Sequence, residues 1–405
     1  MSFITQIGGA GPMKRTEPRQ VLAVACGVHA LHDGFTDLIY VLLPVWQTEF
    51  SLSFAALGVL RMLFAGAMAG LQVPMSLLGK RIGGPLLLAV GTATAGGAYL
   101  VIGLTGAGLT LLIVALFIGG MGAATQHPIG SALVAAAYAD RGARGPLGTY
   151  NFAGDIGKMA LPAATAWSIS MMPWRTALGG IGTLGLVAAV LILALLPHDA
   201  RLAVAADANR ARQRPATNPP HQRHGFSLLF AIGMLDSATR MGFLAFLPFV
   251  LKAKGADTPM VGVALTLIFA GGAAGKLACG WLGARFGVLR TVFLTELGTA
   301  LGIAVLAFSP LTVGLACLPV IGVALNGTSS VLYGTVPELV SSDRHEQAFG
   351  LFYTGTIGSG AVAPLVYGFA GDAFGPTHAV FIVATVCLLT LPLTWALRPS
   401  IAARR

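Results

Sequence analysis

Long apolar runs alternate with short polar breaks along almost the whole chain. Each run has about 20 or more residues, enough for a helix to cross a hydrocarbon core of about 30 Å. The runs lie at 21–46, 53–78, 85–105, 109–137, 146–170, 175–197, 226–251, 258–284, 288–309, 311–338, 346–370 and 377–397. This pattern predicts an all-α integral membrane protein with twelve transmembrane helices in two six-helix pseudo-symmetric halves.

The polar segments divide the chain into five parts. These are an N-terminal tail (1–20), a first six-helix half (21–197), a linker (198–225), a second six-helix half (226–397) and a C-terminal tail (398–405). The linker is rich in Arg, His, Pro, Asn and Gln, a composition typical of a polar connection outside the bilayer. Its histidines, His198, His221 and His224, have the side chains of a metal site, but a solvated linker is the favoured interpretation.

The basic residues predict the orientation of the helices. Most of the 25 Lys and Arg residues lie in the two tails, the linker and the breaks that follow even-numbered runs. The odd-numbered breaks hold only Arg175, Lys252 and Lys254. Because cytoplasmic loops carry the excess of Lys and Arg, both termini are expected in the cytoplasm of a bacterial inner membrane protein.

The two halves repeat one another at an offset of about 204 residues. The matching pairs are Pro44 with Pro248, Gly58 with Gly262, Gly79 with Gly283, Arg81 with Arg285, Gly83 with Gly287 and, at an offset of 202, Pro162 with Pro364. Parallel six-helix repeats of this kind place a substrate cavity between the halves, near the middle of the bilayer.

Composition excludes several classes of protein. The chain is 55% hydrophobic and only 10% charged, whereas soluble domains carry about 25% charged residues. The net charge of +10 comes from basic residues in the breaks between runs, so it indicates topology and predicts no nucleic-acid partner. The sequence has no phosphate-binding loop, nucleophile–base spacing or metal-ligand spacing, and we expect a monomeric non-enzyme without a cofactor or metal.

The first run contains the unusual stretch HALHDGFTDLIY, residues 29–40. His29, Asp33 and Asp37 follow one another at four-residue spacing and share one helix face, whereas His32 is displaced from it. Two adjacent carboxylates repel when both are ionised, so one keeps its proton or a cation lies beside them. We predict that Asp33, Asp37 and His29 couple transport to protons. The alternative is a permanent ion pair that only positions the helices.

Other polar residues within the runs are candidates for binding a substrate. They are Arg61, Gln126, His127, Asn151, Asp155, Lys158, Asp236, Arg240, Asn326, Tyr333 and Tyr353. Burial in lipid is costly for such groups unless they face the bundle interior or water. Pro128, next to His127, is expected to open its helix locally. The structural alternatives are ion pairs within one helix, at Asp155–Lys158 and Asp236–Arg240, and packing contacts between helices. Glu296 receives no role.

The sequence as a whole resembles the major facilitator superfamily. The strings LGKRIG (78–83) and LGARFG (282–287) are similar to its cytoplasmic gating motif, through Gly79, Arg81, Gly83, Gly283, Arg285 and Gly287. Lys80 and Ala284 stand where the family commonly has an Asp. TEFSLSFAALGVL (48–60), QHPIGSAL (126–133) and GTYNFAGDIGKMALPA (148–163) resemble fosmidomycin-resistance-type exporters.

The resemblance implies proton-driven efflux through the bilayer. Our leading hypothesis is a proton-coupled antiporter that exports a small organic compound, drug-like or anionic, by a rocker-switch motion of the two halves. The alternative is a proton symporter or facilitator for uptake of a small metabolite. A third hypothesis is a receptor or scaffold that transports nothing. It does not explain the charged residues inside the membrane, because a scaffold has no need of them.

Overall fold

The computed structural model describes residues 18–104, 108–196, 223–341 and 344–402, and within them all regular structure is helical. The helices of the first half are α1 (Pro18–Asp37), α2 (Ile39–Phe50), α3 (Phe54–Ile82), α4 (Gly84–Leu104), α5 (Leu109–Ala123), α6 (Gln126–Ala137), α7 (Arg144–Met171) and α8 (Trp174–Leu195). Those of the second half are α10 (Arg223–Ala253), α11 (Thr258–Phe286), α12 (Val288–Phe308), α13 (Leu311–Leu339), α14 (His345–Phe374), α15 (Pro376–Cys387) and α16 (Thr390–Ala402).

These helices form the twelve predicted spans, because α1–α2, α5–α6 and α15–α16 are each one span with a local interruption. In the described part of the chain, ten spans are long and apolar enough to cross a membrane by length and composition alone. The two that fall short are α1–α2 and α7, which contain Asp33, Asp37, Asp155 and Lys158. The predicted fold class is therefore confirmed, and the two spans that fall short contain four of the charged candidate residues.

Two of the interruptions have a proline as their cause. α5 and α6 are separated at Ala124 and Thr125, and Pro128 follows Ala124 by four residues. α15 and α16 are separated at Leu388 and Leu389, four residues before Pro392. A proline has no N–H to donate to the carbonyl four residues earlier, so the helix opens there. The opening expected from Pro128 is present, and the one before Pro392 was not foreseen.

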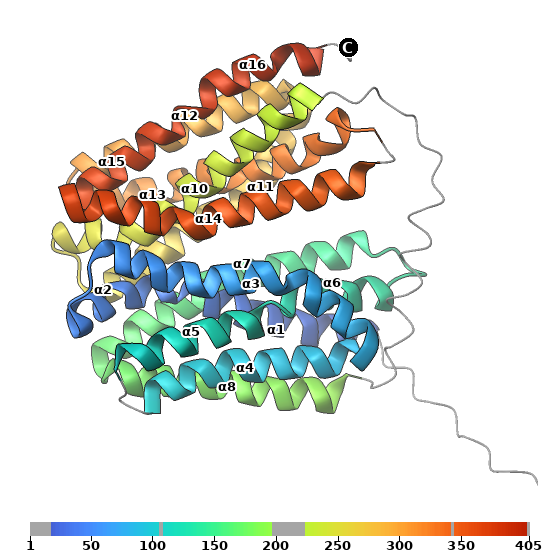
Figure 1. Ribbon diagram of the computed structural model, residues 1–405, viewed down its shortest axis with the longest axis vertical. Helices are drawn as coiled ribbons and strands as arrows, with labels where there is room; N and C mark the ends of the chain where they lie inside the picture. Colours follow the sequence, from blue (N-terminus) through green and yellow to red (C-terminus); the bar gives the residue numbers. More distant parts are fainter. Residues whose placement is uncertain (1–17, 105–107, 197–222, 342–343, 403–405) are drawn as a thin grey trace, which may run out of the picture.

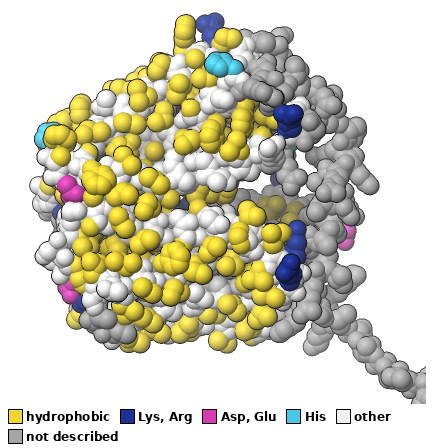
Figure 2. Space-filling model, in the orientation of Figure 1, with side chains coloured by type: hydrophobic (Ala, Val, Ile, Leu, Met, Phe, Trp, Pro, Cys, Tyr) yellow, Lys and Arg dark blue, Asp and Glu magenta, His cyan; other side chains and the backbone are white. Residues whose placement is uncertain are grey.

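The two halves lie side by side, with α1–α8 in one and α10–α16 in the other (Figure 1). We call the linker end the end where α1 and α10 begin and where α8 and α16 finish. The other end, where the chain passes from α2 to α3 and from α14 to α15, is called the opposite end. Across the halves, α3 packs against α14 and α7 against α11. Figure 2 shows hydrophobic side chains over the face in view, with Lys and Arg toward the linker end.

The apolar core differs between the two ends. One continuous cluster joins the halves and includes Phe35, Trp46 and Phe64 from the first and Phe243 and Leu318 from the second. Toward the linker end, each half has a core of its own. The halves are therefore packed together at the opposite end and separated at the linker end, where Figure 2 shows the surface hollowed between them.

Two glycines of the sequence repeat, Gly58 and Gly262, lie at the contacts between the halves. Gly58 of α3 packs against the backbone of Pro364 and Leu365 in α14, and a Cβ at Gly58 would collide with it. Gly262 of α11 packs in the same way against Ala163 and Ala166 of α7, next to Pro162. Gly58 and Gly262, which match at an offset of 204, thus contact the segments around Pro364 and Pro162, which match at 202, in two pseudo-symmetric contacts across the interface.

A carboxylate at the opposite end joins α14 to the start of α3. Asp372 accepts the backbone N–H of Phe54 at 2.6 Å and that of Ala55 at 3.1 Å. The first N–H groups of a helix have no partner within that helix, and its N-terminus attracts negative charge. The second half therefore caps a helix of the first half, a bond that must break when this end opens.

We predict that Gly58→Ala shifts the protein toward a conformation open at the opposite end. The new methyl group meets the backbone of Leu365, and such overpacking costs about 1–3 kcal/mol. Gly66→Ala is the matched control, because it adds the same methyl group to α3 where no atom lies within 4 Å. Spin-label distances between the ends of α3 and α14 measure the effect. Equal distance distributions in the two variants would contradict the prediction.

Candidate functional site

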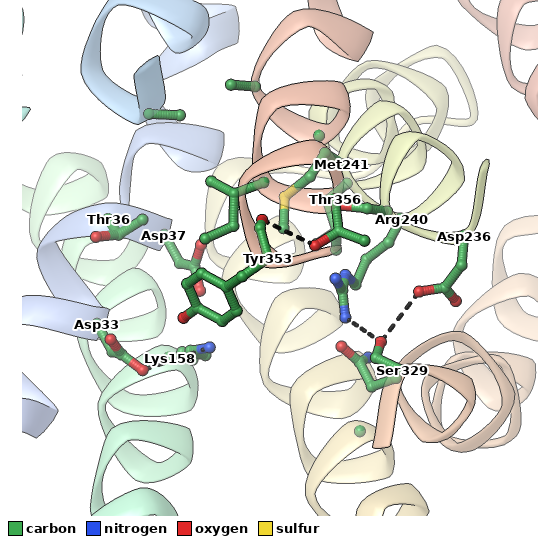
Figure 3. Close-up of a pocket in the computed structure, with 18 of the residues that line it drawn as sticks. Asp33, Thr36, Asp37, Lys158, Asp236, Arg240, Met241, Ser329, Tyr353 and Thr356 are labelled. Atoms are coloured by element: carbon green, nitrogen blue, oxygen red, sulfur yellow. Dashed lines mark hydrogen bonds and ion pairs between the residues drawn. The ribbon is translucent and has the colours of Figure 1, made fainter. Parts of the chain in front are cut away.

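A cavity of about 320 Å³ lies between the halves, and Figure 3 shows residues that line it. α1, α3, α6 and α7 line it from the first half, and α10, α11, α13 and α14 from the second. α4, α8, α12, α15 and α16 do not contribute to its wall. This volume falls at the lower end of the range for small-molecule sites, about 300–1,000 Å³.

Most of the residues predicted from the sequence line this cavity. They are Asp33, Asp37, Arg61, His127, Asp155, Lys158, Asp236, Arg240, Asn326, Tyr333 and Tyr353. His29 and Gln126 lie buried behind the wall, where both contact Tyr150. Asn151 is exposed near the linker end of α7 and is not part of the lining. Its position gives no support to the predicted role in binding.

Asp33 is the centre of the charged network in the first half. Its Oδ2 lies 3.4 Å from Nζ of Lys158 and 3.5 Å from Nε2 of His29, and its Oδ1 lies 3.6 Å from Nε2 of His127 (Figure 3). Helix packing explains the approach, because Gly157 of α7 lies directly against the backbone of Ala30 in α1. A side chain at Gly157 would push Lys158 away from the carboxylate.

The ring of His29 is held from behind by Tyr150. His29 Nδ1 lies 2.8 Å from the backbone carbonyl of Tyr150, and the two rings stack at 4.1 Å. Gln126 donates to the Tyr150 hydroxyl at 3.1 Å. Because a carbonyl oxygen only accepts hydrogen bonds, Nδ1 must carry a hydrogen and donate it. His29 is therefore oriented with Nε2 toward Asp33.

Asp37 has fewer partners than Asp33. It forms an ion pair of 3.9 Å with Arg61, whose guanidinium donates to the Tyr40 hydroxyl at 3.2 Å. The Tyr40 hydroxyl in turn donates to Sδ of Met241, in the second half, at 3.3 Å. Asp37 thus lies at the floor of the cavity, beside a chain of contacts that crosses between the halves.

The strongest charged contact between the halves is Lys276 with Asp155. Nζ of Lys276 donates to Oδ1 and Oδ2 of Asp155 at 2.5 and 2.8 Å. The sequence spacing allowed Asp155 to pair with Lys158, one turn along the same helix, but Lys158 lies against Asp33. Lys276 is absent from the site residues predicted above, although the sequence contains a signal for it. It is a basic residue within an apolar run, as Lys158 is.

In the second half, Ser329 connects Asp236 with Arg240. Arg240 donates to Oγ of Ser329 at 2.8 Å, and Ser329 donates to Oδ2 of Asp236 at 3.0 Å (Figure 3). The structure thus shows a serine bridge where the spacing suggested a direct pair. Glu296, which received no role, lies behind this wall with 2% of its surface exposed, and it accepts from Cys387 and Thr390.

The remaining polar residues from the sequence lie away from the cavity. His32 is buried against Thr92 of α4, with 2.9 Å between Nε2 and Oγ1. Gly83 and Gly287 end α3 and α11 with positive φ angles of 98° and 84°, which explains glycine there. Arg81 is exposed, and Arg285 stacks over Trp281. Among the described residues, neither arginine forms an ion pair with an acidic side chain.

The charged residues of the cavity wall balance one another. The carboxylates Asp33, Asp37, Asp155 and Asp236 face the cations Arg61, Lys158, Arg240 and Lys276. Each carboxylate has a basic side chain near it, directly or through Ser329. The formal charges of these eight side chains cancel. When one carboxylate gains a proton, or when a charged ligand enters, the net charge of the cavity therefore changes.

We predict that Lys276→Met destabilises the protein by about 1–2 kcal/mol, since it leaves the Asp155 carboxylate without its partner. The loss stays modest because the Lys276 side chain is 43% exposed and water screens the pair. Adding Asp155→Asn should recover most of the lost stability, which thermal unfolding in detergent measures. If the two substitutions are additive, the pair contributes no coupling energy and the prediction is wrong.

Comparisons with known proteins agree with this architecture. The sequence matches the model of the Major Facilitator Superfamily over residues 25–231 and again over 229–405. No curated protein is significantly similar to it in sequence. A solved structure of a bacterial homologue of the human lysosomal transporter Spinster, inward-facing and occupied, superposes with a TM-score of 0.80 at 14% identity, covering 97% of this chain and 99% of that one.

Two further solved structures show the same fold. The unoccupied, inward-facing form of the Spinster homologue gives a TM-score of 0.79 at 15% identity, covering 98% of this chain and 99% of its own. A variant of the nucleoside transporter NupG gives 0.73 at 15% identity, covering 94% and 99%. Identities this low establish the fold alone. Because both repeats match the family over nearly the whole chain, the protein belongs to the Major Facilitator Superfamily and is a membrane transporter.

Proposed function

We propose that the protein is a proton-coupled antiporter that exports a small organic compound. The observation that carries the proposal is a cavity between the halves that is lined by four carboxylates, each with a cationic neighbour. Ionisable residues are rare inside a membrane, where they pair with one another and mark ion or substrate pathways, and two of the carboxylates lie one turn apart on α1. The cavity volume suits a compound of small-molecule size.

Asp37 is the carboxylate that carries the transported proton in this proposal. Asp33 is already compensated by Lys158 at 3.4 Å and adjoins two imidazoles, whereas Asp37 has only the longer contact of 3.9 Å with Arg61. A carboxylate with weaker compensation gains more from taking up a proton. Asp33 and Lys158 then form the part of the site that orients the substrate.

The orientation follows from the positive-inside rule. With the Lys- and Arg-rich linker end in the cytoplasm, the structure is open inward and closed outward. In this orientation both termini lie in the cytoplasm. We further propose that the protein is a monomer in a bacterial inner membrane. The arginines Arg81 and Arg285 lie at the open end, where they are available to hold the halves together in the outward-facing state. The proposed assignment to the fosmidomycin-resistance-type exporters rests on the sequence strings of α2–α3, α6 and α7.

Charge balance in the cavity connects the substrate to the direction of coupling. Protonation adds a positive charge to a neutral wall, so it weakens the binding of a cation and strengthens that of an anion. Exchange of protons for substrate therefore suits an amine or another cationic compound. The second candidate function, proton symport of an anionic metabolite, is favoured by the four basic side chains in the same wall.

We predict that Asp37→Asn uncouples transport from protons without abolishing substrate binding. A sensitivity panel in cells that lack or overproduce the protein first identifies a transported compound, which is then used in proteoliposomes. The variant should lose accumulation driven by a pH gradient and keep counterflow exchange, which needs no net proton movement. Asp140→Asn, at an exposed turn, is the control. Intact gradient-driven flux in Asp37→Asn would exclude Asp37 as the carrier.

The charge of the identified compound provides a separate prediction. A gradient of a cationic substrate should drive protons in the opposite direction, and a gradient of an anionic one in the same direction. A pH-sensitive dye inside the proteoliposomes reports the direction of proton movement. Proton export alongside a cationic substrate would contradict the charge argument, and no proton movement with any transported substrate would identify a facilitator.

A further inference from the structure

Three side chains with metal-binding atoms meet at the wall of the cavity in the first half. They are His29, Asp33 and His127, and one ligand atom from each lies within 4.8 Å of the other two. They come from α1 and from the first turn of α6, immediately after the interruption at Ala124 and Thr125. Two imidazoles and a carboxylate are a common ligand set for divalent transition metals.

The second observation is the unpartnered nitrogen of His29. His29 is 3% exposed, and its Nε2 has no hydrogen-bond partner. Since Nδ1 donates to the Tyr150 carbonyl, Nε2 of the neutral ring presents a lone pair toward Oδ2 of Asp33, 3.5 Å away. A lone pair facing a carboxylate is repelled unless a cation lies between them. A histidine held through its other nitrogen by a carbonyl is the usual arrangement in metal sites.

The distances fit a tetrahedral ion. Zinc binds histidine nitrogen and carboxylate oxygen at about 2.0–2.2 Å, which puts neighbouring ligand atoms about 3.3–3.6 Å apart. The observed separations are 3.5 Å from His29 Nε2 to Oδ2 of Asp33 and 3.6 Å from His127 Nε2 to Oδ1 of Asp33, so each imidazole faces a different oxygen of the carboxylate. All three ligand atoms lie within 4.8 Å of one another, and binding of an ion requires the carboxylate and the partly exposed His127 ring to turn toward it.

We propose that His29, Asp33 and His127 bind a divalent transition-metal ion of the zinc class at the wall of the central cavity. Asp33 and His127 line the cavity, so the fourth coordination position faces it and is open to water or to a ligand atom of a transported compound. The site stands apart from the direction and coupling of transport, because it requires only these three side chains and access from the cavity.

Lys158 competes with the metal ion for the carboxylate of Asp33. Its Nζ lies 3.4 Å from the same Oδ2 of Asp33 that faces His29, so an ammonium group and a dication compete for one carboxylate oxygen. Binding of the metal displaces Lys158 toward its neighbours in the wall. The ion and the lysine therefore occupy Asp33 alternately.

Zinc binding to the metal-free protein in detergent tests the proposal, by titration calorimetry and by the absorption of Co(II) as a spectroscopic substitute. We expect one ion per chain with a tetrahedral Co(II) spectrum. His127→Ala should weaken binding by at least about tenfold. Lys158→Met should strengthen it by at least about threefold, since a competing charge is removed. Lys252→Met is the control and should leave the affinity unchanged, because Lys252 is exposed at the opposite end and is not part of the cavity wall.

The linker histidines are the other possible source of metal binding. A variant with His198, His221 and His224 changed to Ala should keep the tetrahedral site; His198 and His221 lie outside the described residues. Binding that persists in His127→Ala and disappears in this triple variant would overturn the proposal. No binding in the wild-type protein would also overturn it. All readouts are equilibrium measurements, so a failure of the proposed transport function does not affect them.

Discussion

Compensation of buried charge is the constraint on which this structure depends. An ionised group inside a membrane protein is costly unless an opposite charge or a set of hydrogen bonds lies beside it. Asp33 meets this requirement through Lys158, and Asp155 through Lys276 in the other half. The helices are rotated so that these groups share one cavity, and the close packing of α1 on α7 at Gly157 keeps the first pair together. The polar interior thereby determines the helix arrangement as much as the apolar surface does.

Partner exchange follows from this constraint. When one carboxylate gains a proton or a ligand, the cation beside it becomes uncompensated and must find another partner. Lys158 lies on the same helix as Asp155, whose own partner, Lys276, belongs to the second half. A change at Asp33 can therefore be transmitted to the interface between the halves through a short series of ion pairs. This is the kind of two-state connection that alternating access requires.

The sequence was sufficient for those features that depend on local pattern. Span positions, the repeat and most of the cavity residues could be predicted, because run length, glycine position and intramembrane charge are local properties. The partners could not be predicted. Lys158 contacts Asp33 rather than Asp155, because helix rotation and tertiary packing decide which of two nearby carboxylates a lysine reaches. Asn151 has the same polar character as the cavity residues but lies exposed, since periodicity does not give depth along a helix.

The cap that Asp372 provides for α3 differs from the buried ion pairs in one respect. Its bond to the Phe54 N–H is exposed, so it is in contact with the solution at the opposite end of the protein. Dissolved ions screen exposed charges over about 10 Å at 0.1 M but have little effect on buried ones. Salt in the surrounding medium therefore weakens the cap at this exposed end more than it weakens the pairing of the buried Asp33 with Lys158.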